Sequence, residues 1–534
     1  MLRGPYLVSG VAIEAGEEFR GIRLRKFQEE TLEAVERAEK ALITIDAPTG
    51  SGQTLAALLA VWERGPRSGR FAVFVYPTNQ LIEDQARSIS HLMEKIGVAG
   101  SRGSSVIIVA SESLEEEART RGLKTHGEAL LQLVTESPGG IILTNPEVLM
   151  MLLKGVPRFS RHEAIFRELF STLSALVIDE VHLYYGFSLA NLTHALYLLR
   201  DKLELVVAMS ATPSGLREIE EVLRDRTIVR ITASRRDVWP EEGLDGWELV
   251  RHPGKLWLHP SRRRILWDEE DLALMTQLAL EAYSSLEGVT IPEGAVKLLV
   301  LVNSVVFAET LARRIEEELG VPVGRVHGLT PPEARSTEGE VVVGTRAADV
   351  GVDFHALGVL FEASDAPTFI QRLGRGCRRC ACRAWAVLPP GVVEALSIEL
   401  REPRVEYSRL TSAIERFMCT PEVYGEFLSS RWAALIYAST LLAIVGEERV
   451  RVQPVPGRGT SVWDRLAGLL EELGVPPQVE NVVRSLGGPE GLAREAAKHS
   501  AAVRSLAACL MLSLIHISEP TRPRLISYAV FCLK

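Results

Sequence analysis

The sequence predicts an α/β protein built from two tandem doubly wound parallel sheets, followed by a helical region. Two series of strand-length apolar runs alternate with helical stretches along the chain. Buried parallel strands read as continuous apolar runs, because helices cover both faces of such a sheet. Hydrophobic residues make up 46% and charged residues 24% of the 534 residues, which suffices for more than one globular core and excludes a disordered chain.

Two groups of apolar runs define the expected strands. The first group predicts strands at 41–45, 71–76, 105–110, 140–144, 174–179 and 203–210, with helices such as 54–62 and 83–96 between them. The second group predicts strands at 297–304, 320–327, 340–345, 357–363 and 383–388. Because strands alternate with helices, each group is expected to form a parallel, doubly wound sheet.

The segments outside these groups set the expected domain bounds. Residues 234–264 are rich in Pro, Gly, Trp and charge, which is typical of a linker or an insertion, and the chain turns helical after Pro390. We therefore expect a first domain over 1–233, a linker or insertion over 234–268, a second domain over 269–395 and a helical C-terminal region over 396–511.

Residues 512–534 look foreign to the chain. LSLIHISEPTR (512–522) and ISYAVFCL (526–533) resemble in-frame translations of a common sequencing-library adapter, with three residues between them. The alternative is a natural C-terminal helix and strand. Two adapter matches in the right order favour an artefact, so these residues support no functional inference and the position of the native C-terminus stays open.

Charge and cysteine content are those of an intracellular protein. The net charge is −9 and the pI about 5.8, so the protein as a whole has no basic field to attract a polyanion. Six cysteines in a chain of this length do not form a disulfide framework. The N-terminus makes a poor signal peptide, and the longest apolar run is too short for a bilayer. These features predict a cytoplasmic protein with no membrane partner.

The loop after the first expected strand has the pattern of a phosphate-binding loop. It reads APTGSGQT, and small residues there let backbone N–H groups wrap a phosphate at a helix N-terminus. Against the pattern GxxxxGK[ST], an Ala stands at the first Gly and a Gln at the Lys. A Gly-rich turn is the structural alternative for this loop alone. The residues expected to bind nucleotide are Ala47, Pro48, Thr49, Gly50, Ser51, Gly52, Gln53 and Thr54.

An acidic pair ends the fifth expected strand. Asp179 and Glu180 follow an apolar run and precede Val181 and His182. Asp179 and the hydroxyl of Thr54 are expected to hold Mg²⁺, and Glu180 to position the water that attacks a phosphate. A solvated acidic turn is the alternative, but the order of the two blocks along the chain favours a site for ATP and Mg²⁺.

Nine blocks in order make the sequence resemble a superfamily 2 helicase of the DEAD/DEAH type. Besides the phosphate-binding loop, the blocks are RKFQ (25–28), PTNQL (77–81), TNPE (144–147), DEVH (179–182), SAT (210–212), LVNS (301–304), VGTRAADVGVDF (343–354) and QRLGRGCR (371–378). Each block alone has a purely structural reading. Together they cover about residues 20–390 and imply two RecA-like domains with ATP between them.

The resemblance assigns roles to individual residues. Phe27 and Gln28 would recognise adenine, Gly351 and Asp353 would contact the nucleotide from the second domain, and Gln371, Arg375 and Arg378 would join Asp179 and Glu180 in catalysis. His182, Ser210 and Thr212 would couple nucleotide state to domain closure. Thr78, Thr144, Asn303 and Thr345 would contact the nucleic-acid backbone, which needs no strong net positive charge.

The amino-acid sequences of these blocks resemble those of one subfamily more than those of others. IDAPTGSG, VIDEVHLYYGFS, VHGLTPPEAR and FEASDAPTFIQRLGRG are similar to the helicase of type I CRISPR interference, in its archaeal form (subtype A). That resemblance implies single-stranded or duplex DNA as substrate, a CRISPR effector complex as recruiter and an HD-type nuclease as partner. The chain contains no His-Asp dipeptide, so we expect the nuclease to be a separate subunit. A Ski2-like or DEAH-type repair or RNA helicase is the alternative.

Gln53 leaves two functional readings open. Only 10 of the 60 basic residues are Lys, and none stands at the position in the phosphate-binding loop that needs a charge. In the first reading the chain is an ATP-dependent helicase impaired by this residue, which is natural, an error or an introduced change. In the second it is a non-hydrolysing scaffold that binds nucleic acid. Because Thr54, Asp179, Glu180, Arg375 and Arg378 are retained, we favour the first.

Cys377, Cys380 and Cys382 cluster within and just after the last block. A structural zinc site needs four ligands, and no matching set of His and Cys follows. We therefore interpret the three residues as small thiols, buried or partly exposed. Cys377 also stands where this block usually has a Gly, which bears on the placement of Arg378.

Overall fold

The computed structural model describes residues 3–418 with gaps, and Ser485. The gaps are 49, 154–161, 185, 211–215, 263–265, 267, 293–294, 328–329, 331–338, 346–347 and 349–354. The expected C-terminal helices and residues 512–534 lie outside the described residues. The chain forms two compact units, of which the second comprises 146–162, 184–201 and 422–534. In that second unit, α6 (Pro146–Leu153) and α8 (Gly186–Leu199) pack against each other.

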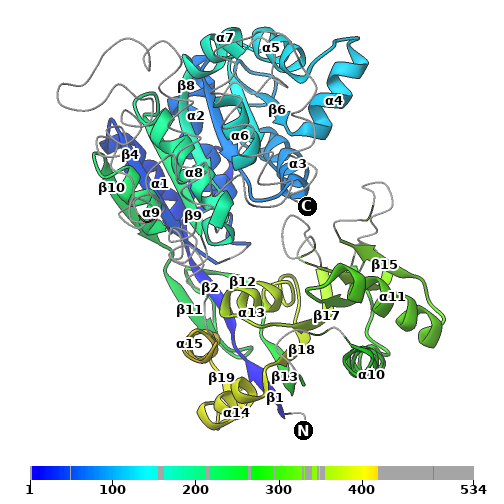
Figure 1. Ribbon diagram of the computed structural model, residues 1–534. Coiled ribbons are helices and arrows are strands. Elements are labelled where there is room, and N and C mark those ends of the chain that lie inside the picture. The colour runs from blue at the N-terminus through cyan, green and yellow to red at the C-terminus, as the bar shows by residue number, and fades with distance from the viewer. Residues whose placement is uncertain are drawn as a thin grey trace. The chain divides into compact units, whose positions relative to one another are not determined.

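Seven parallel strands form the first sheet, in the order β10-β4-β9-β8-β5-β7-β6. Figure 1 labels β4, β6, β8, β9 and β10 of this sheet. They are β4 (Ala41–Asp46), β5 (Phe71–Val75), β6 (Ser105–Val109), β7 (Gly140–Thr144), β8 (Leu173–Ile178), β9 (Leu205–Ser210) and β10 (Thr227–Thr232). The six strands predicted for this sheet are confirmed. The structure adds β10, which pairs with β4 along its whole length.

Helices follow the strand ends of this sheet. They are α1 (Lys26–Arg37), α2 (Gln53–Arg64), α3 (Asn79–Lys95), α4 (Ser111–Thr120), α5 (His126–Glu136), α7 (His162–Ile165) and α9 (Leu216–Val222), with short turns η1 (Pro66–Ser68), η2 (Phe166–Phe170) and η3 (Val181–Leu183). Apolar side chains of α1, α2 and α3 form one buried cluster with those of the sheet. Consecutive residues of α2 are buried, so this helix is covered on most sides and its sequence is apolar almost throughout.

The second sheet has eight strands in the order β15-β16-β14-β17-β18-β13-β1-β19. They are β1 (Arg3–Val8), β13 (Gly254–Pro260), β14 (Ala295–Leu301), β15 (Val323–Val326), β16 (Gly339–Gly344), β17 (His355–Glu362), β18 (Cys382–Leu388) and β19 (Arg404–Val405). The five strands predicted for it, β14 to β18, are confirmed and pair in parallel. Two tandem parallel sheets establish the predicted fold class.

Both faces of the second sheet are covered. Helices α10 (Glu269–Ser285) and α11 (Val305–Leu319) pack on one face, and α13 (Ala366–Leu373), α14 (Pro390–Glu399) and α15 (Tyr407–Phe417) on the other. Along β14, Leu299 and Leu301 join the second group of helices, while Leu298 and Val300 join the first. This alternation follows from the two-residue period of a strand, with both faces apolar because both are buried.

A small antiparallel sheet contains part of the expected linker. It consists of β2 (Gly10–Phe19) between β11 (Arg235–Val238) and β12 (Trp247–Arg251), with β3 (Ile22–Arg25) also paired to β2. The predicted domain bounds remain a proposal, but strand pairing differs from them in two places. Residues 3–8 pair with the second sheet rather than the first, and 254–260 form a strand of that sheet rather than a linker. Polar and Gly-rich composition concealed these strands, since it resembles that of loops.

None of the helices in the described ranges combines the length and the apolar character that crossing a membrane requires.

Replacing Asp365 by Ala should lower the free energy of unfolding of the second sheet by about 1 kcal/mol, because an N-cap side chain would be lost. Asp365 caps α13 by accepting the Thr368 N–H at 2.9 Å. Urea unfolding can be followed by tryptophan fluorescence, since Trp257 and Trp385 stack within this sheet with ring centroids 5.0 Å apart. Asp365→Ser keeps a capping oxygen and is the control; equal losses in both variants would contradict the assignment of the cap.

Candidate nucleotide and nucleic-acid site

The phosphate-binding loop lies between β4 and α2, at the carboxyl edge of the first sheet. Gly50 and Gly52 take left-handed backbone conformations, with φ of 78° and 84°. A Cβ on Gly52 would lie 2.7 Å from Nε2 at the end of the Gln28 side chain, so it is mainly the left-handed backbone that favours glycine here. The hydroxyl of Ser51 is buried and makes no hydrogen bond to the described part of the chain. An orphaned hydroxyl in such a loop fits a bound phosphate.

Gln28 is held against this loop. Its Nε2 donates to the carbonyl of Gly52 at 2.9 Å, and its Oε1 accepts the Arg25 N–H at 2.8 Å. The side chain is almost fully buried, as is that of Phe27. The block predicted to recognise adenine therefore contacts the phosphate-binding loop directly. Recognition of the adenine edge by Gln28 remains a proposal.

Gln53 lies across its own loop. Its Nε2 donates to the carbonyl of Ala47, the residue that stands at the first Gly of the pattern. Thr54, next in the chain, donates its hydroxyl to Oε1 of Gln85 at 3.3 Å, and Gln85 lies on α3. A neutral amide bonded within the loop supplies no charge to a phosphate, whereas a lysine ammonium would.

Asp179 and Glu180 directly follow β8; the Asp179 side chain is buried and that of Glu180 is 18% exposed. Oδ1 of Asp179 accepts the Glu180 N–H at 2.9 Å, and Glu180 has a left-handed backbone with φ of 49°. Burial, and then the charge of Glu180, raise the pKa of Asp179 well above its usual range. Two neighbouring acids in this position are costly unless a cation neutralises them.

His182 connects the acidic pair to the next strand. Its Nδ1 lies 3.5 Å from Oε2 of Glu180 and 3.3 Å from the hydroxyl of Ser210, at the end of β9. Burial lowers the pKa of His182, and the nearby Glu180 only partly opposes this. The ring is therefore neutral near pH 7 and leaves the charge of the acidic pair uncompensated. Two of the three predicted coupling residues, His182 and Ser210, thus contact each other beside the acidic pair.

These residues fit a divalent cation and a nucleotide phosphate. An uncompensated carboxylate pair, a nearby threonine hydroxyl and an orphaned serine hydroxyl in a glycine-rich loop are the donor set that Mg²⁺ and phosphate take together. Thr54 and Asp179 are the residues that would hold the cation.

The predicted nucleic-acid contacts of the first sheet differ in accessibility. Thr78 caps α3 by accepting the Leu81 N–H at 3.3 Å. Thr144 is buried, and its hydroxyl donates to the carbonyl of Val109 at 2.8 Å, so this hydroxyl is already engaged within the sheet. Its neighbour Asn145 instead donates to Oδ1 of Asn79 at 2.7 Å. This Asn79–Asn145 pair connects two of the helicase-like blocks at the same sheet edge.

The carboxyl edge of the second sheet carries the other two predicted contacts. Asn303 follows β14 and donates its amide to Oε1 of Glu362, the last residue of β17. Thr345 follows β16 and is buried. Burial raises the pKa of Glu362 to about 7, while the charge of nearby Arg372 and the hydrogen bond from Asn303 act in the opposite direction. Asn303 is therefore oriented by a group that titrates near neutral pH.

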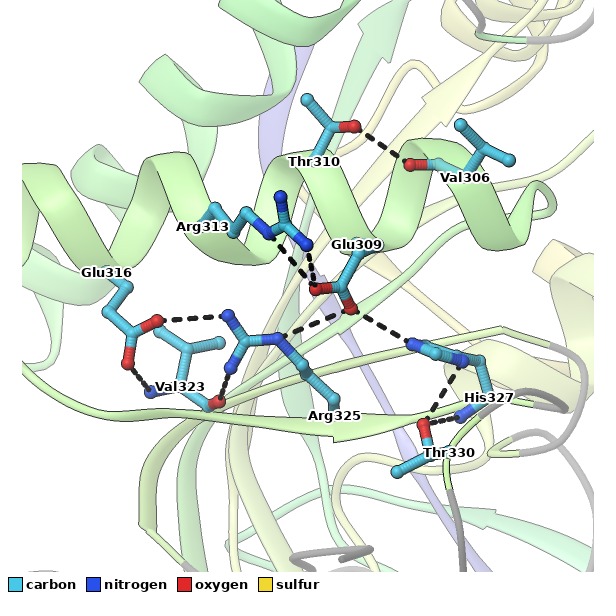
Figure 2. A network of polar contacts seen from close by, with 9 residues as sticks. All are labelled: Val306, Glu309, Thr310, Arg313, Glu316, Val323, Arg325, His327 and Thr330. Atoms are coloured by element: carbon cyan, nitrogen blue, oxygen red, sulfur yellow. Dashed lines mark hydrogen bonds and ion pairs between the residues drawn. The ribbon is translucent and has the colours of Figure 1, made fainter.

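A charged network joins the end of β15 to α11 (Figure 2). Oε2 of Glu309, on α11, lies 3.3 Å from Nε2 of His327 and 3.4 Å from Nε of Arg325. Nδ1 of His327 in turn lies 3.1 Å from the hydroxyl of Thr330. Burial alone would raise the pKa of Glu309, but the His327 hydrogen bond and the charges of Arg325 and Arg313 lower it on balance. One carboxylate on α11 thus contacts both Arg325 and His327.

The block at 371–378 spans the end of α13 and the loop after it. Gln371 and Arg375 are buried, and Arg378 donates its Nε to the carbonyl of Gly374 at 3.1 Å. Arg372, for which no role was predicted, is fully buried and donates to the carbonyls of Glu362 and Val302 at 2.7 and 3.1 Å. It joins the ends of β17 and β14 to α13, which is a structural role.

The interpretation of the cysteines as separate thiols is wrong for two of them. Cys377 and Cys382 form a disulfide, and Cys380 is the free cysteine of the three. The loop returns directly into β18, which brings the two Cα atoms to 4.8 Å, within the usual range for a bridge. Cys377 has φ of 60°, so it keeps the left-handed backbone that a Gly at this position would adopt. No cluster of potential metal ligands occurs in the described segments.

Four predicted residues lie outside the described residues: Thr49, Thr212, Gly351 and Asp353. Other residues of interest were missed by the sequence reading. Asn79, Asn145 and Glu362 lie inside quoted blocks, so their position in the blocks was an available signal. Arg251, discussed below, gave no signal, because it contacts residues more than 120 positions away in the chain.

Comparison with known families decides what this combination of loop, acids and arginines is. Residues 25–222 match the sequence profile described as "DEAD/DEAH box helicase". This part of the chain is therefore similar to a DEAD/DEAH box helicase domain. This family consists of ATP-hydrolysing enzymes, and the acidic pair, His182 and the phosphate-binding loop all lie within the matched residues.

Three known helicases illustrate how far the similarity extends. The chain is 24% identical over 371 residues to "CRISPR-associated endonuclease/helicase Cas3" of Escherichia coli K12, which covers 62% of the chain and 40% of that protein. It is 24% identical over 392 residues to "Uncharacterized ATP-dependent helicase YprA" of Bacillus subtilis 168, covering 69% and 46%. The solved structure of Mycobacterium smegmatis helicase Lhr bound to ssDNA and AMP-PNP covers 86% of the chain and 55% of its own, with a TM-score of 0.56 and 17% identity.

These similarities establish the tandem RecA-like helicase fold. The chain spans less than half the length of the two curated relatives it matches.

The raised pKa of Glu362 predicts a pH-dependent stability. Its pKa is about 7 in the folded chain and near 4.5 unfolded, so the folded state binds the proton more tightly and stability falls as pH rises from about 4.5 to 7. Glu362→Gln should remove this loss and stabilise the helicase by about 3 kcal/mol at pH 8 while changing little at pH 4.5. Urea unfolding at both pH values measures it; parallel curves for wild type and variant would contradict the assignment.

Proposed function

We propose that this helicase is an ATP-driven translocase that unwinds DNA, and that Gln53 impairs the hydrolysis step. The observation that supports this most is the pair of buried Asp179 and partly exposed Glu180, beside a His182 whose pKa is lowered by burial. A protein that only scaffolds nucleic acid gains nothing from holding two acids in this position, and their burial is costly. The retained Arg375 and Arg378 point in the same direction.

Each residue has a defined part in the proposed reaction. Mg²⁺, when bound, neutralises phosphate charge during transfer. Thr54 and Asp179 hold it, the backbone at 50–54 cradles the phosphates, and Glu180 orients the attacking water. Gln371, Arg375 and Arg378 act on the nucleotide from the second sheet. Such positioning of donors and charges supplies most of the acceleration in phosphoryl transfer.

Coupling to nucleic acid is proposed to pass through His182 and Ser210. His182 contacts Glu180 on one side and the end of β9 on the other, so a change at the γ-phosphate can reach the segment that follows β9. Thr78 and the Asn79–Asn145 pair, with Asn303 and Thr345, are the proposed contacts to the DNA backbone. Contacts of this kind bind a strand with little regard to its sequence.

We further propose that the biological setting is type I CRISPR interference, an antiviral defence, with an effector complex as recruiter and a separate HD-type nuclease as partner. The quoted blocks and the 24% identity to Cas3 support this. The equal identity to the ATP-dependent helicase YprA, over a longer alignment, is not specific to a CRISPR protein, so a Ski2-like or DEAH-type repair or RNA helicase is the second candidate. Both candidates share the same ATP-dependent chemistry.

Restoring the charge in the loop should restore activity. Gln53→Lys is expected to raise the kcat of DNA-stimulated ATP hydrolysis by about 100-fold or more, as one lost donor at a developing charge costs on this scale. Phosphate release with saturating single-stranded DNA measures it. The control is Gln53→Lys combined with Glu180→Gln, which should return the rate to background. If the Gln53 chain is already as active as the Lys variant, Gln53 does not impair the enzyme.

If both chains bind nucleotide and neither hydrolyses it, the chain is a scaffold with a helicase fold rather than an enzyme.

The polymer that stimulates hydrolysis distinguishes the proposed substrates. With Gln53→Lys, single-stranded DNA should stimulate ATP hydrolysis at least about 10-fold more than RNA of the same length at equal salt, a difference of about 1.4 kcal/mol. Salt must be fixed because contacts to the phosphate backbone depend strongly on it. Equal stimulation by both polymers, or preference for RNA, would contradict the CRISPR setting and favour an RNA helicase.

A further inference from the structure

The loop that carries Arg375 and Arg378 is held by a short segment far away in the chain. This segment comprises residues 251–254, at the end of β12 and the start of β13, and is called here the 251–254 clamp. It reaches the loop at the end of α13 through a side chain, a backbone N–H and a close packing contact. None of its residues belongs to a helicase-like block.

Arg251 makes the central contact. Its guanidinium Nη1 donates to the carbonyl of Leu373 at 2.9 Å and to that of Gly376 at 3.0 Å. These carbonyls belong to the last residue of α13 and to the residue after Arg375, so a single nitrogen bridges the segment on which Arg375 lies. Arg251 is only 7% exposed, and its guanidinium lies 4.9 Å from the ring centroid of Tyr407, on α15.

The neighbours of Arg251 hold the same loop at its next residue. The N–H of His252 donates to the carbonyl of Cys377 at 2.6 Å. Gly254 lies so close that a Cβ there would be 2.5 Å from Sγ of Cys377. Cys377 is in turn bonded to Cys382, which pairs with Gly254 in the β13–β18 register. Residues 373, 376 and 377 are thus fixed from one side by consecutive elements of the clamp.

Burying an arginine is expensive unless its charge and donors are satisfied, so its retention calls for a reason. Burial lowers the pKa of Arg251. Tyr407 raises this pKa in part, and the like charge of Arg378 lowers it further. A buried cation beside the arginine of a catalytic block costs stability. Arg251 nevertheless fixes the position of the loop, because its guanidinium donates to two carbonyl oxygens there.

We infer that Arg251 is a positioning residue, which holds the loop at 374–378 so that Arg375 and Arg378 are preorganised for the phosphates of ATP. This inference rests on the proposed function. It assigns no contact with substrate to Arg251 itself. A displacement of about 1 Å in a catalytic group can reduce the rate about 100-fold, so such an anchor contributes directly to turnover.

Two variants and a matched control test this inference. Arg251→Met removes both hydrogen bonds, and Arg251→Lys keeps the charge but not the planar fork. Arg226→Met is the control, since Arg226 is also 7% exposed and donates to a backbone carbonyl, that of Leu203 at 2.8 Å, beside the first sheet. The control reports what the loss of any buried arginine does to the chain.

The first measurement needs no activity. Hydrogen exchange of the amides at 374–378 is followed by mass spectrometry in the full chain. Arg251→Met should speed exchange there about 10-fold or more, and Arg226→Met should leave it unchanged. If exchange at 374–378 is the same in both variants, Arg251 does not position the loop, whatever the enzyme does.

The second measurement uses the Gln53→Lys background. Arg251→Met should lower kcat by about 100-fold with the KM for ATP changed less than about threefold, and Arg251→Lys should fall between it and the parent. Arg226→Met should retain the kcat of the parent. A kcat lost equally in Arg226→Met, or unchanged in Arg251→Met, would overturn the catalytic part of the inference. An inactive Gln53→Lys parent would overturn the proposed function instead, and hydrogen exchange would still decide the role of Arg251.

Discussion

The carboxylate pair at the end of β8, buried Asp179 and partly exposed Glu180, is the constraint on which the proposed site depends. They lie side by side at the end of β8, and burial together with their mutual repulsion raises the pKa of Asp179. Neutral His182 does not relieve this. We propose that cations complete the site: Mg²⁺, and the lysine that the phosphate-binding pattern places in the loop. Here Gln53 occupies the position of the lysine and bonds to Ala47 instead.

The second sheet carries arginines instead of acids, and contacts within the sheet hold them in place. Arg375 and Arg378 lie in a loop whose backbone is fixed by Arg251, His252 and the Cys377–Cys382 disulfide. Arg372 secures the preceding helix to the ends of β14 and β17. Buried arginines thus serve as anchors, and the arginines assigned to the nucleotide lie on the anchored segment. Preorganisation of this kind lets charge act on a phosphate without a large rearrangement.

Local patterns in the sequence predicted most of the fold, and they named a candidate site whose residue roles stay a prediction. Continuous apolar runs of strand length identified eleven strands, because parallel strands covered on both faces are apolar on both faces. The loop at 47–54 and the acids at 179–180 were found because phosphate and Mg²⁺ demand particular residues at fixed spacing. The strands at 3–8 and 254–260, the Cys377–Cys382 bond and the role of Arg251 were not foreseen. Each depends on partners distant in the chain, and a single sequence does not encode such pairing in a local pattern.

The central claim is that the nucleotide site is intact except for one charge. Titration calorimetry of Mg²⁺ and AMP-PNP against the chain and its Gln53→Lys variant tests this most directly, since binding does not require turnover. The account predicts saturable binding by both chains, about 10-fold or more tighter in the Lys variant, as expected for one added charge-assisted hydrogen bond. Absence of binding in both chains, or equal affinity in the two, would contradict it.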